Sequence, residues 1–419
     1  MSIAIYGEVG TDYLLKGNRI SYRLGGAGYY AAVAAARQNV KVKFLTVYNS
    51  KVEKYFCGAC CNMGIDLSDS LDSEEFVFPQ YLCRGYEQGE HKESMALMLE
   101  PYKLEFNPKL PGNCDVLLVF PIGNEIPKRL IEEAYHAGVP VLLDPKTNRK
   151  GIHQAKAILE FVTCLLVNDE ELRLLTEETC EEKAIRFLYE EGVHNIIVKH
   201  GARGCSIYQE SKEPVYQAAY CSEAVCQLGS GDVFAGYIAS QLSSSKDIVA
   251  VIDRAQCVAA HFIEQYNVES ILRNAEIDAE QKNRKRVLND LGKRIYLSAP
   301  FFSVAERLLE EQVFNALCSM GFEVYSPLRK KGMLNETSSF AERKDMFHEE
   351  LHEIDSSDFL VAIVDGNDMG TAFELGYAYQ KGKKIFGIYT GNAPLNNMIR
   401  IGCYRISGSV EDLCNEISP

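Results

Sequence analysis

The stretch DFLVAIVDGNDMGTAFELGYAYQKGKKIFGIY, residues 358–389, alternates two short apolar runs with one longer segment of helical pattern. The runs FLVAIVD and KKIFGIY predict buried strands, and GTAFELGYAYQKG between them predicts a helix. A strand, a helix and a second strand in this order form a unit of a parallel sheet covered by helices. The stretch therefore predicts an α/β fold, with Glu374 as the carboxylate in its helical segment.

The same alternation surrounds this unit on its N-terminal side. RIYLSAP and FEVYSP predict two more strands, and VAERLLEEQVFNALCSMG and KDMFHEELHEIDSSD predict two more helices. Residues 294–419 are therefore expected to form a compact, doubly wound domain with a flavodoxin-like or Rossmann-like parallel sheet.

The first two thirds of the chain repeat this pattern with different sequences. Short apolar runs such as SIAIYG, VKFLTV, DVLLVFP, VPVLLD, CLLVN and NIIVKHG alternate with helical patterns such as YYAAVAAARQN and IPKRLIEEAYHAG. Residues 281–293, QKNRKRVLNDLGK, are polar and dense in charge, which is typical of a linker. We therefore predict a first α/β domain at 1–280, a linker at 281–293 and a second domain at 294–419.

Composition excludes some classes of partner. The chain of 419 residues carries a net charge of -14, which argues against general binding to nucleic acid or to an anionic membrane. Its 14 cysteines are scattered among apolar segments, so we read them as reduced thiols. No signal-like N-terminus and no apolar run of membrane-spanning length is present, so a cytoplasmic protein is expected.

Carboxylates gather where the predicted strands of the second domain end. In a doubly wound sheet, ligands bind at the carboxyl ends of the strands, and Tyr296 lies in the first strand while Glu374 follows the third. Two carboxylates commonly break glycosidic bonds, one attacking the anomeric carbon and one handling the proton. The candidate partners of Glu374 are the other acidic residues of this region: Glu350, Asp358, Asp365 and Asp368.

Three separated motifs of this domain resemble one family. RIYLSAPFFSVAER, DFLVAIVDGNDMGTAFELGYAYQKGKKIFGIY and PLNNM are similar, in this order, to motifs of the nucleoside 2-deoxyribosyltransferase family over residues 294–408. The resemblance implies that Glu374 is the nucleophile of a covalent deoxyribosyl intermediate and that Tyr296 orients it. It implies no cofactor, and nucleosides, nucleobases or nucleotides as small-molecule partners.

The resemblance also carries roles for four further residues. Glu350 stands where the family usually has an aspartate that protonates the leaving base, and Asp368 matches the residue that holds the sugar hydroxyls. Asn396 and Met398 match residues that reach into a neighbouring subunit's site, so the resemblance implies a homo-oligomer with shared C-terminal sites. SAPFF replaces the commoner AGPFF pattern on the segment next to the base.

The acceptor of the sugar and the need for a 5′-phosphate stay open. Water in place of a second base would make the domain a hydrolase of nucleosides, nucleotides or a dinucleotide. Family members that act on 5′-phosphates need donors or a cation for the phosphate. The candidates here are Ser303, Arg307, Arg329, Lys330 and Lys331, although such charges commonly only solvate a loop.

The segment VCQLGSGDVFAGYIASQL, residues 225–242, has the composition of an anion site in the first domain. Gly229, Ser230 and Gly231 precede a predicted helix, so their amides and the helix dipole favour a phosphate there. Asp232 beside that site is a candidate base for an attacking hydroxyl, and phosphoryl transfer needs little more than this arrangement and Mg²⁺.

Four motifs place this segment in a wider resemblance. RLGGAGYYAAVAAARQNVKVKFLTV, LLDPKTN, LLVNDEELRLLT and VKHGARGCSIY are similar, in this order, to motifs of the ribokinase-like PfkB sugar and nucleoside kinases over residues 1–275. The resemblance implies a ribokinase-like α/β fold that uses ATP and Mg²⁺. It implies a catalytic base at Asp232, an anion hole at Gly229–Gly231, a magnesium and phosphate pattern at Asn168 and Glu171, and a substrate end at Asp12, Gly25 and Gly26.

Two departures from this pattern bear on the substrate. Cys226, Gln227 and Leu228 replace the usual Asp-Thr approach to the glycines, and Tyr30 replaces an asparagine that binds hydroxyls in many sugar kinases. These departures indicate a substrate unlike ribose, such as one with a stackable base, or a kinase fold that only binds a nucleotide.

Two hypotheses follow from the pair of domains. In the first, a bifunctional enzyme of nucleoside metabolism cleaves or exchanges N-glycosidic bonds with its second domain and phosphorylates a sugar or nucleoside with its first. In the second, the kinase-like domain senses a nucleotide and controls a glycosidase that acts on deoxynucleotides or NAD.

Overall fold

The computed structural model describes residues 1–16, 19–84, 94–95, 106–123, 125–146, 149–178, 180–222, 228–242, 247–265, 267–287, 293–320, 322–331, 339–391 and 394–417. Two compact units are present, one comprising Met1–Gly85 and Ser94–Lys285 and the other containing Arg286–Pro419. Among the described residues, no helix has the length and apolar character needed to cross a lipid bilayer.

A nine-stranded sheet organises the first unit, in the order β15-β14-β13-β12-β11-β10-β1-β4-β6. The strands from β6 to β13 pair in parallel, whereas β14 runs antiparallel to both of its neighbours. Their bounds are β1 Ser2–Tyr6, β4 Lys41–Leu45, β6 Ile65–Asp66, β10 Val116–Val119, β11 Val141–Leu143, β12 Cys164–Asn168, β13 Asn195–Lys199, β14 Gly204–Gln209 and β15 Val215–Ala218.

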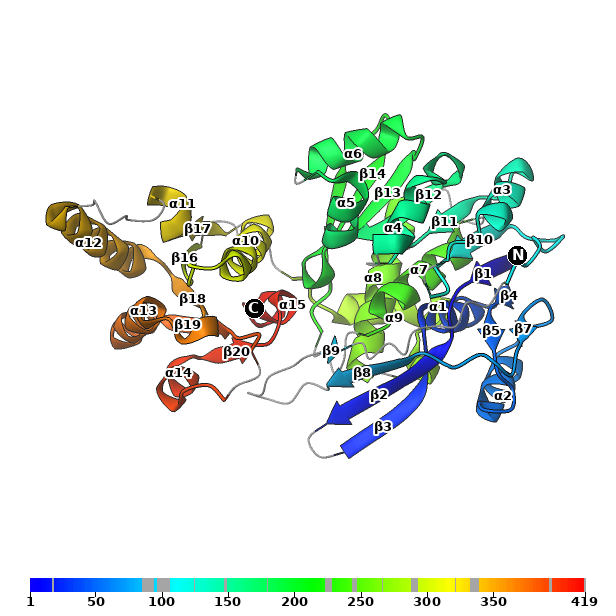
Figure 1. Ribbon diagram of the computed structural model, residues 1–419, viewed down its shortest axis with the longest axis horizontal. Helices are drawn as coiled ribbons and strands as arrows, with labels where there is room; N and C mark the ends of the chain where they lie inside the picture. Colours follow the sequence, from blue (N-terminus) through cyan, green and yellow to red (C-terminus); the bar gives the residue numbers. More distant parts are fainter. Residues whose placement is uncertain are drawn as a thin grey trace. The chain divides into compact units, whose positions relative to one another are not determined.

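Both faces of this sheet are buried, which explains why its strands read as continuous apolar runs. Successive residues point to opposite faces, so Ile3 and Ile5 join one core while Ala4 and Tyr6 join the other. The first core takes side chains from α1 Ala27–Ala36, α2 Lys54–Asn62, α7 Ser230–Gln241, α8 Ile248–Gln265 and α9 Asn274–Asn283. The helices of the second core are α3 Lys128–His136, α4 Arg149–Lys156, α5 Asp169–Thr176 and α6 Glu181–Glu190 (Figure 1).

A smaller sheet of four strands accompanies the large one, in the order β3-β2-β8-β9. Its strands are β2 Gly10–Lys16, β3 Arg19–Gly25, β8 Gln80–Arg84 and β9 Ser94–Met95, and β2 and β3 extend away from the large sheet as an antiparallel pair (Figure 1). The short strands β5 Val47–Tyr48 and β7 Leu71–Asp72 form a separate pair, and α9 Asn274–Asn283 follows α8. The sequence analysis did not predict this smaller sheet.

The second unit contains a five-stranded, entirely parallel sheet in the order β17-β16-β18-β19-β20. Its strands are β16 Arg294–Ser298, β17 Glu323–Tyr325, β18 Phe359–Ile363, β19 Lys384–Ile388 and β20 Arg405–Ser407. In chain order this is the 2-1-3-4-5 arrangement of flavodoxin-like folds, which confirms the predicted α/β class.

Helices cover this second sheet on both faces. Tyr296, Leu360 and Ala362 share a core with α12 Phe340–Ser356 and α13 Met369–Gln380. The helices α10 Val304–Ser319 and α15 Val410–Ile417 contact each other and the strands β17, β19 and β20. Two shorter helices, α11 Pro327–Lys331 and α14 Asn397–Gly402, complete this unit, and α14 lies against α13.

Candidate functional site

Glu374 lies at the carboxyl edge of the second sheet, where it meets the end of β16. The hydroxyl of Tyr296 donates a 2.6 Å hydrogen bond to Oε1 of Glu374, and the hydroxyl of Ser298 donates to Oε2. Tyr296 and Ser298 alternate on one face of β16, and both are 0% exposed. The strand order reverses between β16 and β18, and this is the point where doubly wound sheets bind ligands.

Burial governs the charge of this carboxyl group. It raises the pKa of Glu374 from 4.5 to about 7, although the hydrogen bonds from Ser298 and Tyr296 favour the ionised form. The charges of Glu350 and Asp368 raise the pKa further. Two of the predicted site residues therefore lie close enough to Glu374 to act on it electrostatically.

Asp368 and Glu350 reach this site from different elements. Asp368 precedes α13 and caps it, because its Oδ2 accepts a 2.6 Å hydrogen bond from the amide of Thr371. Glu350 lies on α12 and is half-buried. The structure thus brings Glu374, Tyr296, Glu350 and Asp368 together from three segments of the chain: β16, α12 and α13 with its capping residue.

Two other carboxylates that the sequence offered as partners of Glu374 accept hydrogen bonds from backbone amides instead. Asp358 accepts a 2.7 Å hydrogen bond from the amide of Arg294, at the beginning of β16 and therefore at the opposite end of the sheet. Asp365 accepts hydrogen bonds of 2.9 Å and 3.0 Å from the amides of Thr390 and Gly391 and ties down the segment after β19. Both side chains have structural roles here.

Within the described part of this chain, no contact joins Asn396 or Met398 to Glu374. Asn396 caps α14 by accepting a 2.8 Å hydrogen bond from the amide of Met398. The side chain of Met398 is 79% exposed. Their predicted role in a neighbouring subunit's site stays a prediction.

Two of the predicted phosphate ligands have partners within the protein. Ser303 forms a capping box with Glu306 at the start of α10, and Arg329 pairs with buried Glu310 at 3.2 Å. Arg307 is half-buried on α10. The side chains of Lys330 and Lys331 lie outside the described residues.

The glycine-rich segment of the first unit leads directly into α7. Gly229 adopts a left-handed backbone conformation with φ of 86°, and a β-carbon there would lie 2.7 Å from the ring of Tyr30. Ser230, Gly231 and Asp232 form the first turn of α7, whose free amides and dipole favour an anion. Cys226 and Gln227 lie outside the described residues.

The predicted substrate end of the first unit is assembled around Asp12. Asp12 on β2 is 1% exposed, accepts a hydrogen bond from the hydroxyl of Tyr30, and packs so closely on Gly25 that a side chain there would collide with its carboxylate. Gly26 also needs a glycine, because its φ is 93°. Burial raises the pKa of Asp12 to about 6, while the hydrogen bond from Tyr30 and the charge of Arg23 oppose this rise.

Asp12 has the properties of a ligand for a substrate hydroxyl. Its Oδ1 has no hydrogen-bond partner within the described residues. Arg23 donates a 3.0 Å hydrogen bond to the hydroxyl of Tyr30, and its guanidinium lies 5.5 Å and 5.6 Å from the ring centres of Tyr30 and Phe262. A buried acceptor beside aromatic rings fits a group that has both a hydroxyl and a flat apolar surface.

Two lysines that the sequence analysis did not single out lie beside the predicted anion site. Lys146 pairs with Oδ1 of Asp232 and lies 3.6 Å from Asp144. Lys199 pairs with Asp144 at 2.6 Å, and its ammonium would lie 3.7 Å from a β-carbon at Gly231. Lys146 has a φ of 57°, a left-handed conformation that is uncommon outside glycine and is concentrated at functional sites.

The carboxylate between these lysines is fully buried. Burial by itself would raise the pKa of Asp144, but the ammonium groups of Lys146 and Lys199 outweigh it and hold this pKa below its usual range. The carboxylates of Asp232 and Asp144 thus hold the ammonium groups of Lys146 and Lys199 beside the segment Gly229–Gly231. This donor set, two ammonium groups and a helix N-terminus, suits a polyphosphate.

Asn168 and Glu171 have a structural role, and their expected role with magnesium and phosphate stays a prediction. The side chain of Asn168 accepts a 2.7 Å hydrogen bond from the amide of Glu171, and Glu171 accepts a 2.8 Å bond from the amide of Asn168. They form a capping box at the start of α5. Burial raises the pKa of Glu171, while the nearby charges of Lys199 and Lys146 oppose the rise, so Glu171 also belongs to the charged cluster.

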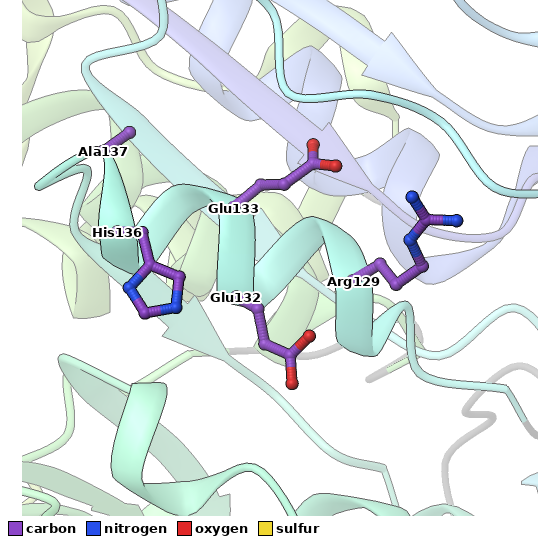
Figure 2. A pocket seen from close by; sticks show the side chains of 5 residues that line it. All are labelled: Arg129, Glu132, Glu133, His136 and Ala137. Atoms are coloured by element: carbon purple, nitrogen blue, oxygen red, sulfur yellow. The ribbon is translucent and has the colours of Figure 1, made fainter.

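A pocket on α3 is separate from both groups of residues. Figure 2 shows its lining, Arg129, Glu132, Glu133, His136 and Ala137, which all come from α3 and the residue after it. Most of these side chains are exposed on one side of the helix. None of the predicted site residues lines this pocket, so we do not treat it as a candidate site.

Three residues that the sequence analysis missed, Ser298, Lys146 and Lys199, nevertheless lie in motifs that it had quoted. Ser298 belongs to the SAPFF departure, which we read as a mild change next to the base. Lys146 and Lys199 lie in LLDPKTN and VKHGARG, two motifs used for the resemblance but not for the chemistry. Each lies at or just beyond the carboxyl end of a predicted strand, where functional groups are expected in parallel sheets.

Family models match two regions of the chain. Residues 114–274 match the pfkB family carbohydrate kinases, and residues 295–416 match nucleoside 2-deoxyribosyltransferase. The second region contains the residues around Glu374. The first contains the residues around Asp232 but not those from β2, β3 and α1, such as Asp12 and Tyr30. The resemblance found in the sequence is therefore confirmed.

Curated relatives match the first part of the chain. The ribokinase of Haemophilus influenzae is 22% identical over 270 residues, which cover 61% of this chain and 86% of the ribokinase. The deoxyribokinase of Salmonella typhi is 28% identical over 276 residues, which cover 56% of this chain and 80% of that protein. Bifunctional protein HldE of Alkalilimnicola ehrlichii is 27% identical over 164 residues, and this chain spans only 34% of its length.

Solved structures show the same fold for the first unit. Ribokinase of Arabidopsis thaliana, complexed with ribose and ATP, has a TM-score of 0.56 and 16% identity, and the match covers 67% of this chain and 98% of that one. A nucleoside kinase of Burkholderia thailandensis in complex with inosine has a TM-score of 0.56 and 16% identity, with 68% and 96% covered. The chain therefore combines a ribokinase-like domain of the pfkB family with a domain of the nucleoside 2-deoxyribosyltransferase family.

Proposed function

We propose that the C-terminal domain cleaves or exchanges the N-glycosidic bond of 2′-deoxynucleosides through a covalent intermediate on Glu374. The observation that supports this proposal is the Glu374 carboxylate, held by two buried hydroxyls at the carboxyl edge of the sheet, with Glu350 and Asp368 beside it. Two carboxylates around one anomeric carbon are the usual equipment of a retaining glycosidase.

In this proposal the side chains have the roles that the family resemblance implies. A carboxylate oxygen of Glu374 forms a bond to the anomeric carbon while the carbon–nitrogen bond breaks, and its electron pair leaves with the base. Glu350 supplies the proton that the leaving base needs, and Asp368 holds the sugar. A second base, or water, then attacks the same carbon and frees Glu374.

Purified full-length protein mixed with a deoxynucleoside and a different free base tests this proposal. We expect mass spectrometry to detect the exchanged nucleoside, or the free sugar if water is the acceptor, and we expect Glu374→Ala to abolish both products. Asp358→Asn is the control, because Asp358 lies at the opposite end of the sheet. Undiminished exchange in Glu374→Ala rules the mechanism out.

We also propose that the N-terminal domain transfers a phosphoryl group from ATP to a sugar or nucleoside. The amides of Gly229–Gly231, Lys146 and Lys199 fit the phosphates of ATP, and Mg²⁺ would be held mainly by phosphate oxygens and water. Asp232 takes the proton of the attacking hydroxyl, and Asp12 binds another hydroxyl of the same substrate. Failure to form ADP with a broad panel of sugars and nucleosides removes this half of the proposal.

A shared pentose connects the two reactions. Hydrolysis of a deoxynucleoside by the C-terminal domain frees 2-deoxyribose, and a relative of the N-terminal domain is named deoxyribokinase. We infer that 2-deoxyribose or a deoxynucleoside is the phosphoryl acceptor. Mass spectrometry of a mixed pool of nucleosides, nucleotides and bases, with and without ATP, identifies the acceptor directly.

One observation favours a second function for the N-terminal domain. Lys146 pairs with Asp232, the expected base, so a nucleotide could bind here without turnover and control the glycosidase, whose substrates would then be deoxynucleotides or NAD. Calorimetry distinguishes the two functions: tight nucleotide binding without ADP formation, together with nucleotide-dependent glycosidase activity, supports the sensor, and ADP formation supports the kinase.

We further propose that the C-terminal domain works as a homo-oligomer. Large apolar side chains of α13 and α14 are exposed: Met369 at 85%, Met398 at 79% and Ile401 at 70%. Exposed apolar groups of this size commonly mark an interface. Light scattering on the full chain and on Met398→Asp tests it, with dissociation expected for the variant.

A further inference from the structure

Ser298 lies next to the proposed nucleophile although no role was expected for it. It is the last residue of β16, is 0% exposed, and shares a face of the strand with Tyr296. Its hydroxyl donates to Oε2 of Glu374, while Tyr296 donates to Oε1. Each oxygen of the carboxylate therefore has its own buried donor from one strand.

The identity of this residue departs from the commoner pattern of the resemblance. SAPFF stands in this chain where AGPFF is more usual, so a serine replaces an alanine at position 298. An alanine has no donor for Oε2. The ring of Tyr296 stacks on Tyr325 with 5.5 Å between ring centres, so the strand that carries both donors is itself firmly packed.

We propose that Ser298 is a positioning residue for Glu374, holding the second carboxylate oxygen so that the nucleophile keeps one orientation towards the anomeric carbon. This inference rests on the function proposed for the C-terminal domain. When either oxygen of Glu374 attacks the anomeric carbon, the bond between this carbon and the nitrogen of the base breaks. The nitrogen leaves with the electron pair and takes a proton. The ester that forms keeps a hydroxyl donor on its carbonyl oxygen, which helps the second displacement.

The groups around Glu374 indicate how its pKa changes when the hydroxyl of Ser298 is removed. The groups that face Glu374 are Tyr296 and Ser298 from β16, Glu350 from α12, Asp368 at the start of α13 and Tyr325 from β17. Burial and the two carboxylates disfavour the ionised nucleophile, and the two hydroxyls favour it. Removal of one hydroxyl therefore raises the pKa of Glu374 and leaves less of the reactive form.

The protonation of Glu374 can be measured without any assumption about activity. A carbodiimide modifies the protonated carboxyl group, and peptide mass spectrometry follows the modification of Glu374 across pH in the full chain. We expect Ser298→Ala to move the midpoint upwards by about one pH unit relative to the wild type. Ser298→Cys, which keeps the volume and a weak donor, should lie between the two.

Ser357→Ala is the matched control for the loss of a buried serine hydroxyl. Ser357 lies just before β18, at the other end of the sheet. It is 2% exposed and donates a 2.8 Å hydrogen bond to the backbone carbonyl of Glu353 in α12. A Glu374 midpoint that is unchanged in both Ser298 variants overturns the inference, as does an equal shift in Ser357→Ala.

Kinetics add a readout that a purely structural role would not move. We expect Ser298→Ala to lower kcat about tenfold below pH 7 with little change in KM, and to approach the wild-type rate at high pH. Equal loss at every pH contradicts the inference. If wild-type protein forms no exchanged nucleoside or free sugar, the proposed function fails, whereas the labelling experiment still decides whether Ser298 holds Glu374.

Discussion

Replacement of Glu374 by glutamine is expected to abolish glycosyl transfer and, at the same time, to stabilise the C-terminal domain above neutral pH. The pKa of Glu374 is raised by burial to about 7 in the folded chain, from an ordinary value of 4.5. Its stabilising contribution is therefore fully present below pH 4.5 and is lost as the pH rises through about 7, because the unfolded chain ionises first. Glutamine does not titrate, so the variant avoids this loss.

The size of the effect follows from the same values. Each unit of pKa difference corresponds to about 1.4 kcal/mol, so ionisation of Glu374 costs the folded domain about 3 kcal/mol at pH 8. At pH 4 the wild type and Glu374→Gln should differ little, because both side chains are then uncharged.

Hydrogen exchange of the amides in β16 and β18 measures the free energy of opening of this domain within the full chain. Asp355→Asn is a control of opposite sign, because hydrogen bonds from Lys381 and Tyr377 hold the pKa of Asp355 below its ordinary value. The Asp355 variant should gain no protection at high pH. A Glu374→Gln variant whose protection follows the wild-type pH dependence would refute the reasoning, because Glu374 would then be ionised in the folded chain at no cost.

Three further predictions concern both domains. Glycosyl transfer should be about tenfold faster at pH 8 than at pH 6, since the ionised form of Glu374 reacts and its pKa is about 7; initial rates check this, and a flat profile contradicts it. Lys146→Met should lower ADP formation by about 100-fold or more in a coupled assay, because the variant removes a cation beside Asp232, and an unchanged rate assigns Lys146 no part in phosphoryl transfer. Asn168→Ala should destabilise the N-terminal domain by about 1 kcal/mol through loss of the capping box; thermal denaturation at fixed pH measures this, and an unchanged melting temperature limits Asn168 to ligand binding.

Much of the fold could be predicted because both faces of the two large sheets are buried. The strands β1, β10 and β12 are apolar at nearly every position, and their neighbours in sequence have helical periodicity. The smaller sheet with β2 and β3 was not predicted, because GTDYLLK and RISYRLG mix polar and apolar residues without clear alternation. The antiparallel turn from β13 to β14 also escaped prediction, since a buried strand reads the same in either direction.

The candidate sites are only partly marked in the local sequence. Asp232 lies in the first turn of α7 and Glu374 in the second turn of α13, so the helices that carry them follow from short-range signals, whereas the groups around them do not. Local sequence did not show that Asp358 lies at the far end of the sheet, because its partner, the amide of Arg294, is 64 positions away.

The sequence by itself determined the order of most buried strands and their covering helices, the α/β class and the residue types available for chemistry, because burial pattern and periodicity are local properties of the chain. Only the tertiary structure decided which of these residues meet. Ser298 and Glu374 are 76 positions apart, and Lys146 and Asp232 are 86 positions apart. The strand order of each sheet brings them into contact, and that order follows from the packing of whole faces rather than from any short segment.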